Sequence, residues 1–103
     1  MTNNPWTEQE YVECLAHERH MYAWCLVHYK GMDATLASNA AVARYPYEEP
    51  SDEYRGLVFH NEAWHWAMLH IFGETYWVAR PDLEDQSREY QDASAAFEQG
   101  AGI

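Results

Sequence analysis

The hydrophobic residues of positions 8–30 recur at the spacing of one long α-helix. Every residue from 21 to 27 is apolar, which predicts that the second half of this helix is surrounded on most sides. The side chains that define the apolar face are Tyr11, Leu15, Tyr22, Cys25 or Leu26, and Tyr29.

Both ends of this first helix carry sequence signals. Thr7 and Glu10 have the spacing of a capping box, so we expect the helix to begin directly after Thr7. Trp6 and Tyr11 occupy the two positions of a hydrophobic staple. Gly31 is the expected stop, because glycine readily adopts the left-handed conformation that ends many helices.

Two further helices are predicted in the middle of the chain. Asp33 can cap an alanine-rich helix over residues 34–44, which must end before Pro46. Residues 45–50 then form a loop, and Ser51 is expected to cap a third helix that ends at Gly73. The core-facing residues of that third helix are predicted to be Leu57, Trp64, Met68 and Ile71.

The pattern weakens toward the carboxyl terminus. Residues 75–79 fit either a strand or a helical turn, and a polar helix is expected over 84–97. Residues 1–5 and 99–103 are expected to be disordered. The predicted fold is all-α: a single domain of about four helices, in which the first and third are long, aromatic-rich and packed together. Their contact is predicted to bury Trp24, Trp64 and Trp66.

Acidic side chains outnumber basic ones by 17 to 6, which gives the 103-residue chain a net charge of -11. Phosphate contacts with nucleic acid or an anionic membrane would be repulsive, so neither is an expected direct partner. Five tryptophans and eight tyrosines are too many for a solvated acidic tail. No stretch approaches the roughly 18 apolar residues of a membrane span.

The expected location is the cytoplasm. The first residues are polar and uncharged, without the basic start and apolar stretch of a signal peptide. Cys14 and Cys25 lie on one predicted helix, about 16 Å apart along its axis, which is beyond disulfide reach. Both are interpreted as small buried groups, as suits a reducing compartment.

No residue pattern identifies an enzyme or a cofactor site. Cys14 and His17 stand on adjacent turns, but no third group is evident that would orient the imidazole. A glycine-rich phosphate loop is also absent from the sequence. We therefore expect a non-enzymatic protein without a cofactor.

A metal site is the alternative function. His17 and His20 share one face of the first helix, and Glu62 and His65 form a Glu-x-x-His pattern on the third. If the two helices are antiparallel neighbours, these four side chains suit zinc or iron. The competing interpretation is that the histidines form hydrogen bonds or lie at the surface.

Acidic and aromatic residues alternate after the second helix. Aromatic side chains anchor protein interfaces, while carboxylates steer and select a basic partner. The alternative is a solvated acidic surface over ordinary core aromatics. The residues predicted to contact a partner are Tyr45, Tyr47, Glu48, Glu49, Asp52, Glu53 and Tyr54.

These patterns favour a small binding protein that occupies the basic site of a nucleic-acid-handling protein. An immunity-type inhibitor, or a phage counter-defence factor such as an anti-CRISPR protein, fits this description, with nucleic-acid mimicry as its means. A homodimer that pairs its exposed aromatic residues is a further alternative.

Four landmarks occur in order along the chain: the segments 6–11 and 45–46, then 56–58 and Trp64. This set resembles the small acidic immunity proteins that neutralise bacteriocin nucleases. The resemblance implies that loop tyrosines and an acidic second helix contact a toxin. The chain departs from this pattern, because its second helix carries only Asp33 and nearly forty residues follow Trp64. We therefore assign no family from these landmarks.

Overall fold

The longest helix, α1 (Glu8–Lys30), has the ends that the sequence predicts. The Thr7 hydroxyl accepts a hydrogen bond from the Glu10 amide, and the Glu10 carboxylate accepts one from the Thr7 amide, each at 3.0 Å. Gly31 ends the helix in the left-handed conformation, at φ 70°. The computed structural model describes residues 7–101, so the predicted staple through Trp6 lies outside the described residues.

The middle of the chain differs from the prediction. α2 (Ala34–Arg44) is capped by the Asp33 carboxylate, as expected. The predicted third helix, however, does not start at Ser51. Turns and the short 3-10 helix η1 (Leu57–His60) precede it, and α3 (Ala63–Phe72) has only 10 residues. Gly56, at φ 82°, interrupts regular helix, and Leu57 points outward instead of into the core.

The ambiguous segment after α3 is helical. α4 (Tyr76–Ala79) is a single turn, followed by the 3-10 helix η2 (Pro81–Leu83) and then α5 (Arg88–Ala101). Residues 99–101, which we expected to be disordered, continue α5, whereas the other residues of that prediction, 1–5 and 102–103, lie outside the described residues. The fold of residues 7–101 is therefore all-α, with five α-helices and two 3-10 helices.

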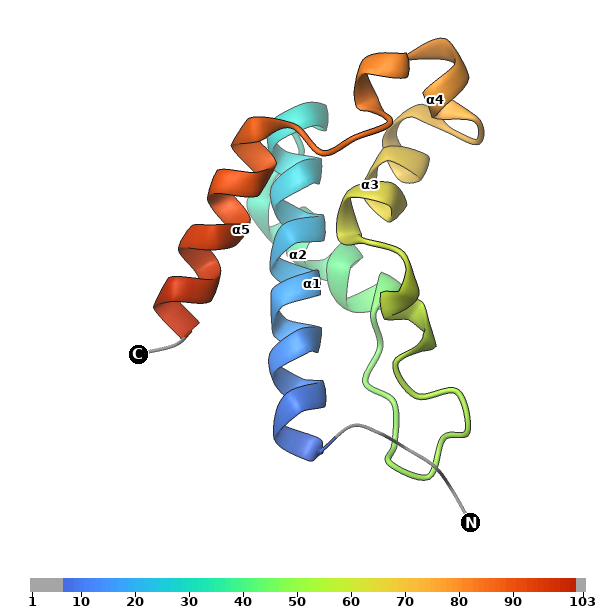
Figure 1. Ribbon diagram of the computed structural model, residues 1–103. Helices are drawn as coiled ribbons and strands as arrows, with labels where there is room; N and C mark the ends of the chain where they lie inside the picture. Colours follow the sequence, from blue (N-terminus) through green and yellow to red (C-terminus); the bar gives the residue numbers. More distant parts are fainter. Residues whose placement is uncertain (1–6, 102–103) are drawn as a thin grey trace.

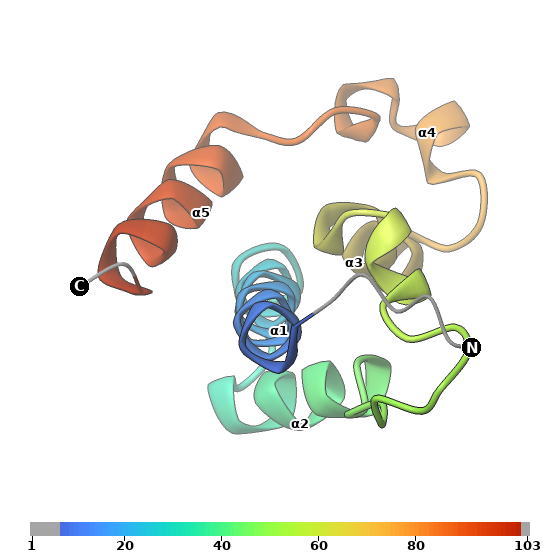
Figure 2. The same cartoon turned by 60° about the horizontal axis from the view of Figure 1, so that its bottom comes forward.

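α1 is the central element of this arrangement. α2, α3 and α5 each pack against it, and Figure 2, viewed close to the axis of α1, shows them arranged around it (Figures 1 and 2). Trp64 is buried in the core that they form, whereas Trp24 and Trp66 are only partly buried at its edge. Within residues 7–101, no helix combines the length and apolar character needed to cross a membrane.

Tyr45 belongs to this core, which corrects its predicted role as a partner contact. Its side chain is 0% exposed, and its ring lies near those of Tyr22 and Phe59. Its backbone carbonyl accepts two hydrogen bonds from the Arg19 guanidinium, at 2.8 and 2.6 Å. The Tyr45 hydroxyl, in contrast, is buried and has no hydrogen-bond partner among the described residues.

Replacing Tyr45 by phenylalanine is therefore expected to stabilise the protein by about 1 kcal/mol, because it removes a buried polar group without a partner. Urea denaturation followed by circular dichroism measures the change. Tyr47→Phe is the matched control, since the Tyr47 hydroxyl donates to the Glu8 carboxylate at 2.8 Å and its loss should destabilise. A lower free energy of unfolding for Tyr45→Phe would contradict the prediction.

Candidate protein-docking site

The loop that joins α2 to η1, residues 45–56, is organised around Arg55. This side chain is only 2% exposed. Its guanidinium donates to the Glu48 carbonyl at 2.9 Å and to the Glu8 carboxylate at 2.6 Å. It also lies over the ring of Tyr11, 3.8 Å from the centroid. The one basic residue of an acidic loop therefore fastens the loop to α1.

Glu48 forms the second attachment of the loop. Its backbone amide donates to the Tyr11 hydroxyl at 2.8 Å, and its carboxylate accepts from the Gly56 amide at 2.9 Å. The Glu48 carboxylate thus binds the backbone of its own loop while the residue lines a surface groove, so its predicted role as a contact stays a prediction. A short turn across residues 49–55 completes the loop, because the Asp52 carboxylate accepts from the Tyr54 amide at 2.8 Å.

The charges inside this network balance one another. Hydrogen bonds from Arg55 and Tyr47 lower the pKa of Glu8, so the Glu8–Arg55 pair remains ionised at neutral pH. With Arg55 engaged in this way, the exposed carboxylates of Glu49 and Glu53 form no ion pair with any residue in 7–101. The outer surface of the loop is consequently negative.

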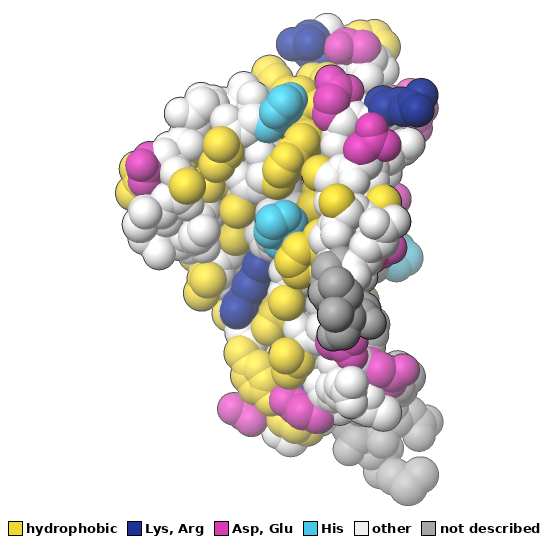
Figure 3. Space-filling view, turned by 90° about the vertical axis from the view of Figure 1, so that its left-hand side faces the viewer, with side chains coloured by type: hydrophobic (Ala, Val, Ile, Leu, Met, Phe, Trp, Pro, Cys, Tyr) yellow, Lys and Arg dark blue, Asp and Glu magenta, His cyan; other side chains and the backbone are white. Residues whose placement is uncertain are grey.

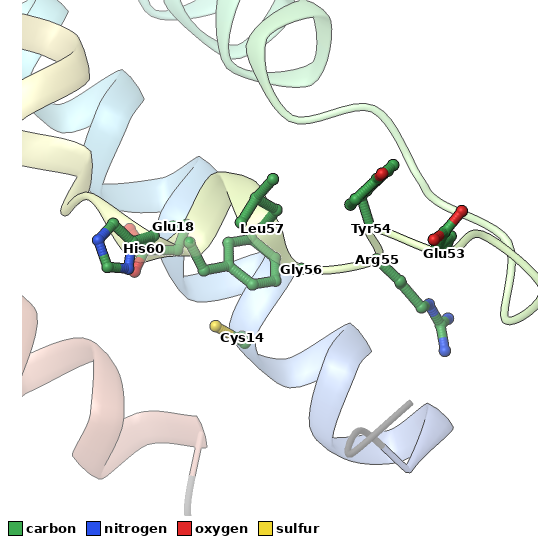
Figure 4. Close-up of a pocket in the computed structure, with 9 residues that line it drawn as sticks. Cys14, Glu18, Glu53, Tyr54, Arg55, Gly56, Leu57 and His60 are labelled. Atoms are coloured by element: carbon green, nitrogen blue, oxygen red, sulfur yellow. The ribbon is translucent and has the colours of Figure 1, made fainter. Parts of the chain in front are cut away.

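Two apolar side chains project from the same region. Tyr54 is 63% exposed and Leu57 is 64% exposed. Together with His60 they border two surface grooves of about 490 and 470 Å³, one on each side. We call these three residues the ridge. Figure 4 shows the larger groove, which lies between the ridge and α1.

The smaller groove has a basic and aromatic wall. The Arg44 guanidinium stacks on Trp66, 4.0 Å from the ring centroid, and the Trp66 indole donates to the Val58 carbonyl at 3.1 Å. These contacts hold both side chains in place beside the ridge. The ridge is therefore flanked by two preformed recesses.

Five of the seven predicted contact residues lie exposed on this loop. The structure adds Leu57, which we predicted to be a core residue, and Arg55, which we did not predict at all. A signal for Arg55 was present in the sequence, because a lone base among carboxylates is commonly paired with one of them. The five exposed residues are Tyr47, Glu49, Asp52, Glu53 and Tyr54.

The residues of the alternative metal site are not brought together. His17 lies 2.8 Å from the Ser94 hydroxyl, and both His17 and His20 stack on Phe97, so these histidines hold α5 against α1. In the part of the chain that the structure describes, no group of three or more His, Cys, Asp or Glu side chains is placed to hold a metal ion.

The other two residues of that set have separate partners. The Glu62 carboxylate accepts a hydrogen bond from the Gln86 amide at 2.6 Å, and His65 lies 3.0 Å from the Tyr76 hydroxyl. Glu62 also stands before α3 instead of within it, so the Glu-x-x-His pattern does not lie on one helical face. The four residues of the alternative metal site therefore have separate partners in the described part of the chain.

The face of the molecule on which α5 lies is more apolar than the loop. Figure 3 shows hydrophobic side chains running along it, with carboxylates toward its edges. The exposed apolar side chains of α1 and α2 include Val12, Val27 and Leu36. A homodimer, the further alternative from the sequence, stays a prediction that size-exclusion chromatography with light scattering tests directly.

Comparison with known proteins adds no relative. No protein-family model, no curated protein and no solved structure matches this chain. Function is therefore inferred from the geometry of the loop and the ridge.

Proposed function

We propose that this protein is a non-enzymatic binding protein that docks on a basic surface of another protein through its 45–56 loop and ridge. The observation that carries the proposal is the ion pair between the buried Arg55 and Glu8. Because this base is paired with Glu8, the loop presents carboxylates without counter-charges beside two exposed apolar side chains, Tyr54 and Leu57.

The energetics of protein interfaces support this use. Apolar side chains near the centre of an interface supply most of the affinity, while surrounding charges speed association and select the partner. A loop already held by hydrogen bonds loses little conformational entropy on binding. The net charge of -11 further steers the protein toward basic surfaces.

The proposed partner is a nucleic-acid-handling protein, because the site that such a protein uses for phosphates is a strongly basic surface. By covering that site, this protein would exclude nucleic acid and act as an inhibitor, with its carboxylates in the place of phosphates. Immunity-type and phage counter-defence inhibitors are the biological classes that this activity fits.

The test of this proposal compares two variants of equal charge. One carries Glu49→Lys, Asp52→Lys and Glu53→Lys in the loop. The other reverses three exposed acids elsewhere, Glu74, Glu84 and Glu89. Partners are captured from nuclease-treated lysate, and their affinities are then measured by biolayer interferometry.

We expect the loop variant to bind at least about 30-fold more weakly and the control only a few-fold more weakly, because charges within an interface contribute more than distant ones. Added nucleic acid should compete with the wild-type protein for the partner. Equal losses in both variants would show that net charge alone matters. Unchanged binding by the loop variant would contradict the proposal.

A further inference from the structure

The larger groove differs in chemistry from the exposed loop. Its middle is apolar, with Cys14 of α1 facing Leu57 and Phe59. Figure 4 shows Glu18 and His60 at one end and the segment that carries Glu53 and Arg55 at the other. The groove therefore offers an apolar channel that leads to a recessed carboxylate.

That carboxylate, Glu18, has a protein hydrogen bond at one of its two oxygens, among the described residues. Its Oε2 atom accepts a hydrogen bond from the Ala63 amide at 3.1 Å, at the start of α3. The residue before α3, Glu62, provides no side-chain cap of its own. Within residues 7–101, Glu18 has no ion pair, and its Oε1 atom has no hydrogen bond.

The nearby bases do not neutralise Glu18. Arg55 is bound to Glu8, and the Arg19 guanidinium is bound to the Tyr45 carbonyl. His60 supplies a positive charge only when it is protonated. A recessed carboxylate without a counter-charge is costly, and a cation from outside would relieve that cost.

We propose that this groove receives a lysine or arginine side chain of the protein partner, with its charged end against Glu18 and its aliphatic stem along Cys14 and Leu57. This inference rests on the proposed function and specifies what the partner must present. A long basic side chain fits the groove better than a free metal ion does. The apolar walls match its aliphatic stem, and a single carboxylate, Glu18, lies at the end of the groove.

Such a contact would depend on pH, because a proton and the cation compete for the same carboxylate. Burial is the main cause that raises the pKa of Glu18 to about 7, so binding should strengthen between pH 6 and pH 8. The pKa values of the thiol and of both tyrosines near Glu18 are raised, so these groups stay neutral in that range. The titratable groups around Glu18 are Cys14, His60, Glu62, Tyr45 and Tyr90.

The test uses the whole protein and a defined probe. The peptide acetyl-Gly-Arg-Gly-amide is titrated at pH 8 while amide chemical shifts are recorded by NMR, and the same peptide with citrulline in place of arginine is the neutral control. We expect saturable shifts at Cys14, Glu18 and Ala63, with the citrulline peptide at least about 5-fold weaker.

Two variants locate the charge that matters. Glu18→Gln keeps an oxygen to accept from Ala63 and should bind the arginine peptide at least about 5-fold more weakly, without the rise between pH 6 and pH 8. Glu13→Gln removes an exposed carboxylate five residues earlier on α1 and should bind like the wild type. His60→Asn removes the neighbouring imidazole and should keep the pH dependence.

Equal binding of the two peptides, shifts outside the groove, or wild-type binding by Glu18→Gln would overturn the inference. If Glu18→Gln leaves partner capture unchanged while the loop variant abolishes it, the groove inference fails and the proposed function stands. If the peptide binds as expected but the loop variant captures the partner as well as the wild type does, the proposed function fails and only the cation site remains.

Discussion

Replacing Trp64 by alanine is expected to lower the free energy of unfolding by about 3–5 kcal/mol. Trp64 is 2% exposed and is among the largest fully buried side chains. Its ring lies 5.4 Å from those of Tyr29 and Tyr90, so one side chain joins α1, α3 and α5. Alanine would leave a cavity at the point where these three helices meet.

The substitution also removes a tertiary hydrogen bond. The Trp64 indole donates to the Leu83 carbonyl at 2.8 Å, which attaches η2 to the core. Without the indole, that buried carbonyl loses its partner and adds to the cost. Trp64→Phe should cost less than alanine, because it keeps an aromatic ring in the core while it loses the hydrogen bond.

Urea denaturation followed by circular dichroism measures these changes. Trp77→Ala is the matched control, because Trp77 is 40% exposed and its loss should cost less than about 1 kcal/mol. Since a domain of this size is stable by only about 5–15 kcal/mol, Trp64→Ala alone is expected to leave much of the protein unfolded at low urea. A similar cost for both tryptophans would contradict the assignment of the core.

The second large effect is the pH dependence that Glu18 imposes on stability. Desolvation by burial raises the pKa of Glu18 from 4.5 to about 7, and the charge of Glu62 adds to the shift. The folded state therefore holds a proton on Glu18 that the unfolded chain releases above pH 4.5. The stability due to this group is complete below pH 4.5 and is lost as the pH rises through 7.

Glu18→Gln should remove this dependence, because the amide stays neutral while it still accepts from Ala63. We expect the variant to match the wild type near pH 4.5 and to exceed it by about 2 kcal/mol at pH 8. The full shift corresponds to about 3 kcal/mol, and exposure of the side chain to the groove reduces that value.

Free energies of unfolding at pH 4.5, 6 and 8 provide the measurement, with Glu13→Gln as the control. The control carries the same chemical change at an exposed position of α1, so its difference from the wild type should stay nearly constant with pH. If Glu18→Gln is less stable than the wild type at pH 8, the half-buried carboxylate is better solvated than we infer.

Sequence was a good guide wherever structure depends on neighbours along the chain. The capping box of Thr7 and Glu10, the Asp33 cap and the stop at Gly31 are all confirmed. Each uses a side chain within three residues of the backbone group that it satisfies, or a glycine in the left-handed region that suits it. At these three positions, the groups that end or start the helix lie close together in the chain.

The start of α3 shows where local signals fail. Ser51 is followed by acids, as at many helix starts, yet the first amide of α3 is that of Ala63 and it donates to Glu18, 45 positions earlier. No pattern around residue 63 could reveal an acceptor on another helix. Because the start of the helix was wrong, Leu57 was predicted to face the core, whereas it lies on the exposed ridge.

Composition singled out the segment that we propose for docking, but it did not predict the direction of its side chains. Acids and aromatics are interleaved in this segment, and Glu49, Asp52, Glu53 and Tyr54 are exposed, while their role as contacts stays a prediction. Glu48 is half-buried, and its carboxylate accepts a hydrogen bond from the Gly56 amide. Loop residues have no fixed periodicity, so tertiary contacts alone decide which of their side chains are exposed and which are buried.

By itself, the sequence determined an acidic all-α fold, both ends of its first helix and the loop that begins after its second helix, because charge, periodicity and these caps are local properties. Only the tertiary structure decided that Arg55 forms an ion pair with Glu8, that Tyr45 lies in the core and that Glu18 lies at one end of a groove. Those roles depend on contacts between residues that are distant in the sequence, and the packing of the other helices around α1 determines those contacts.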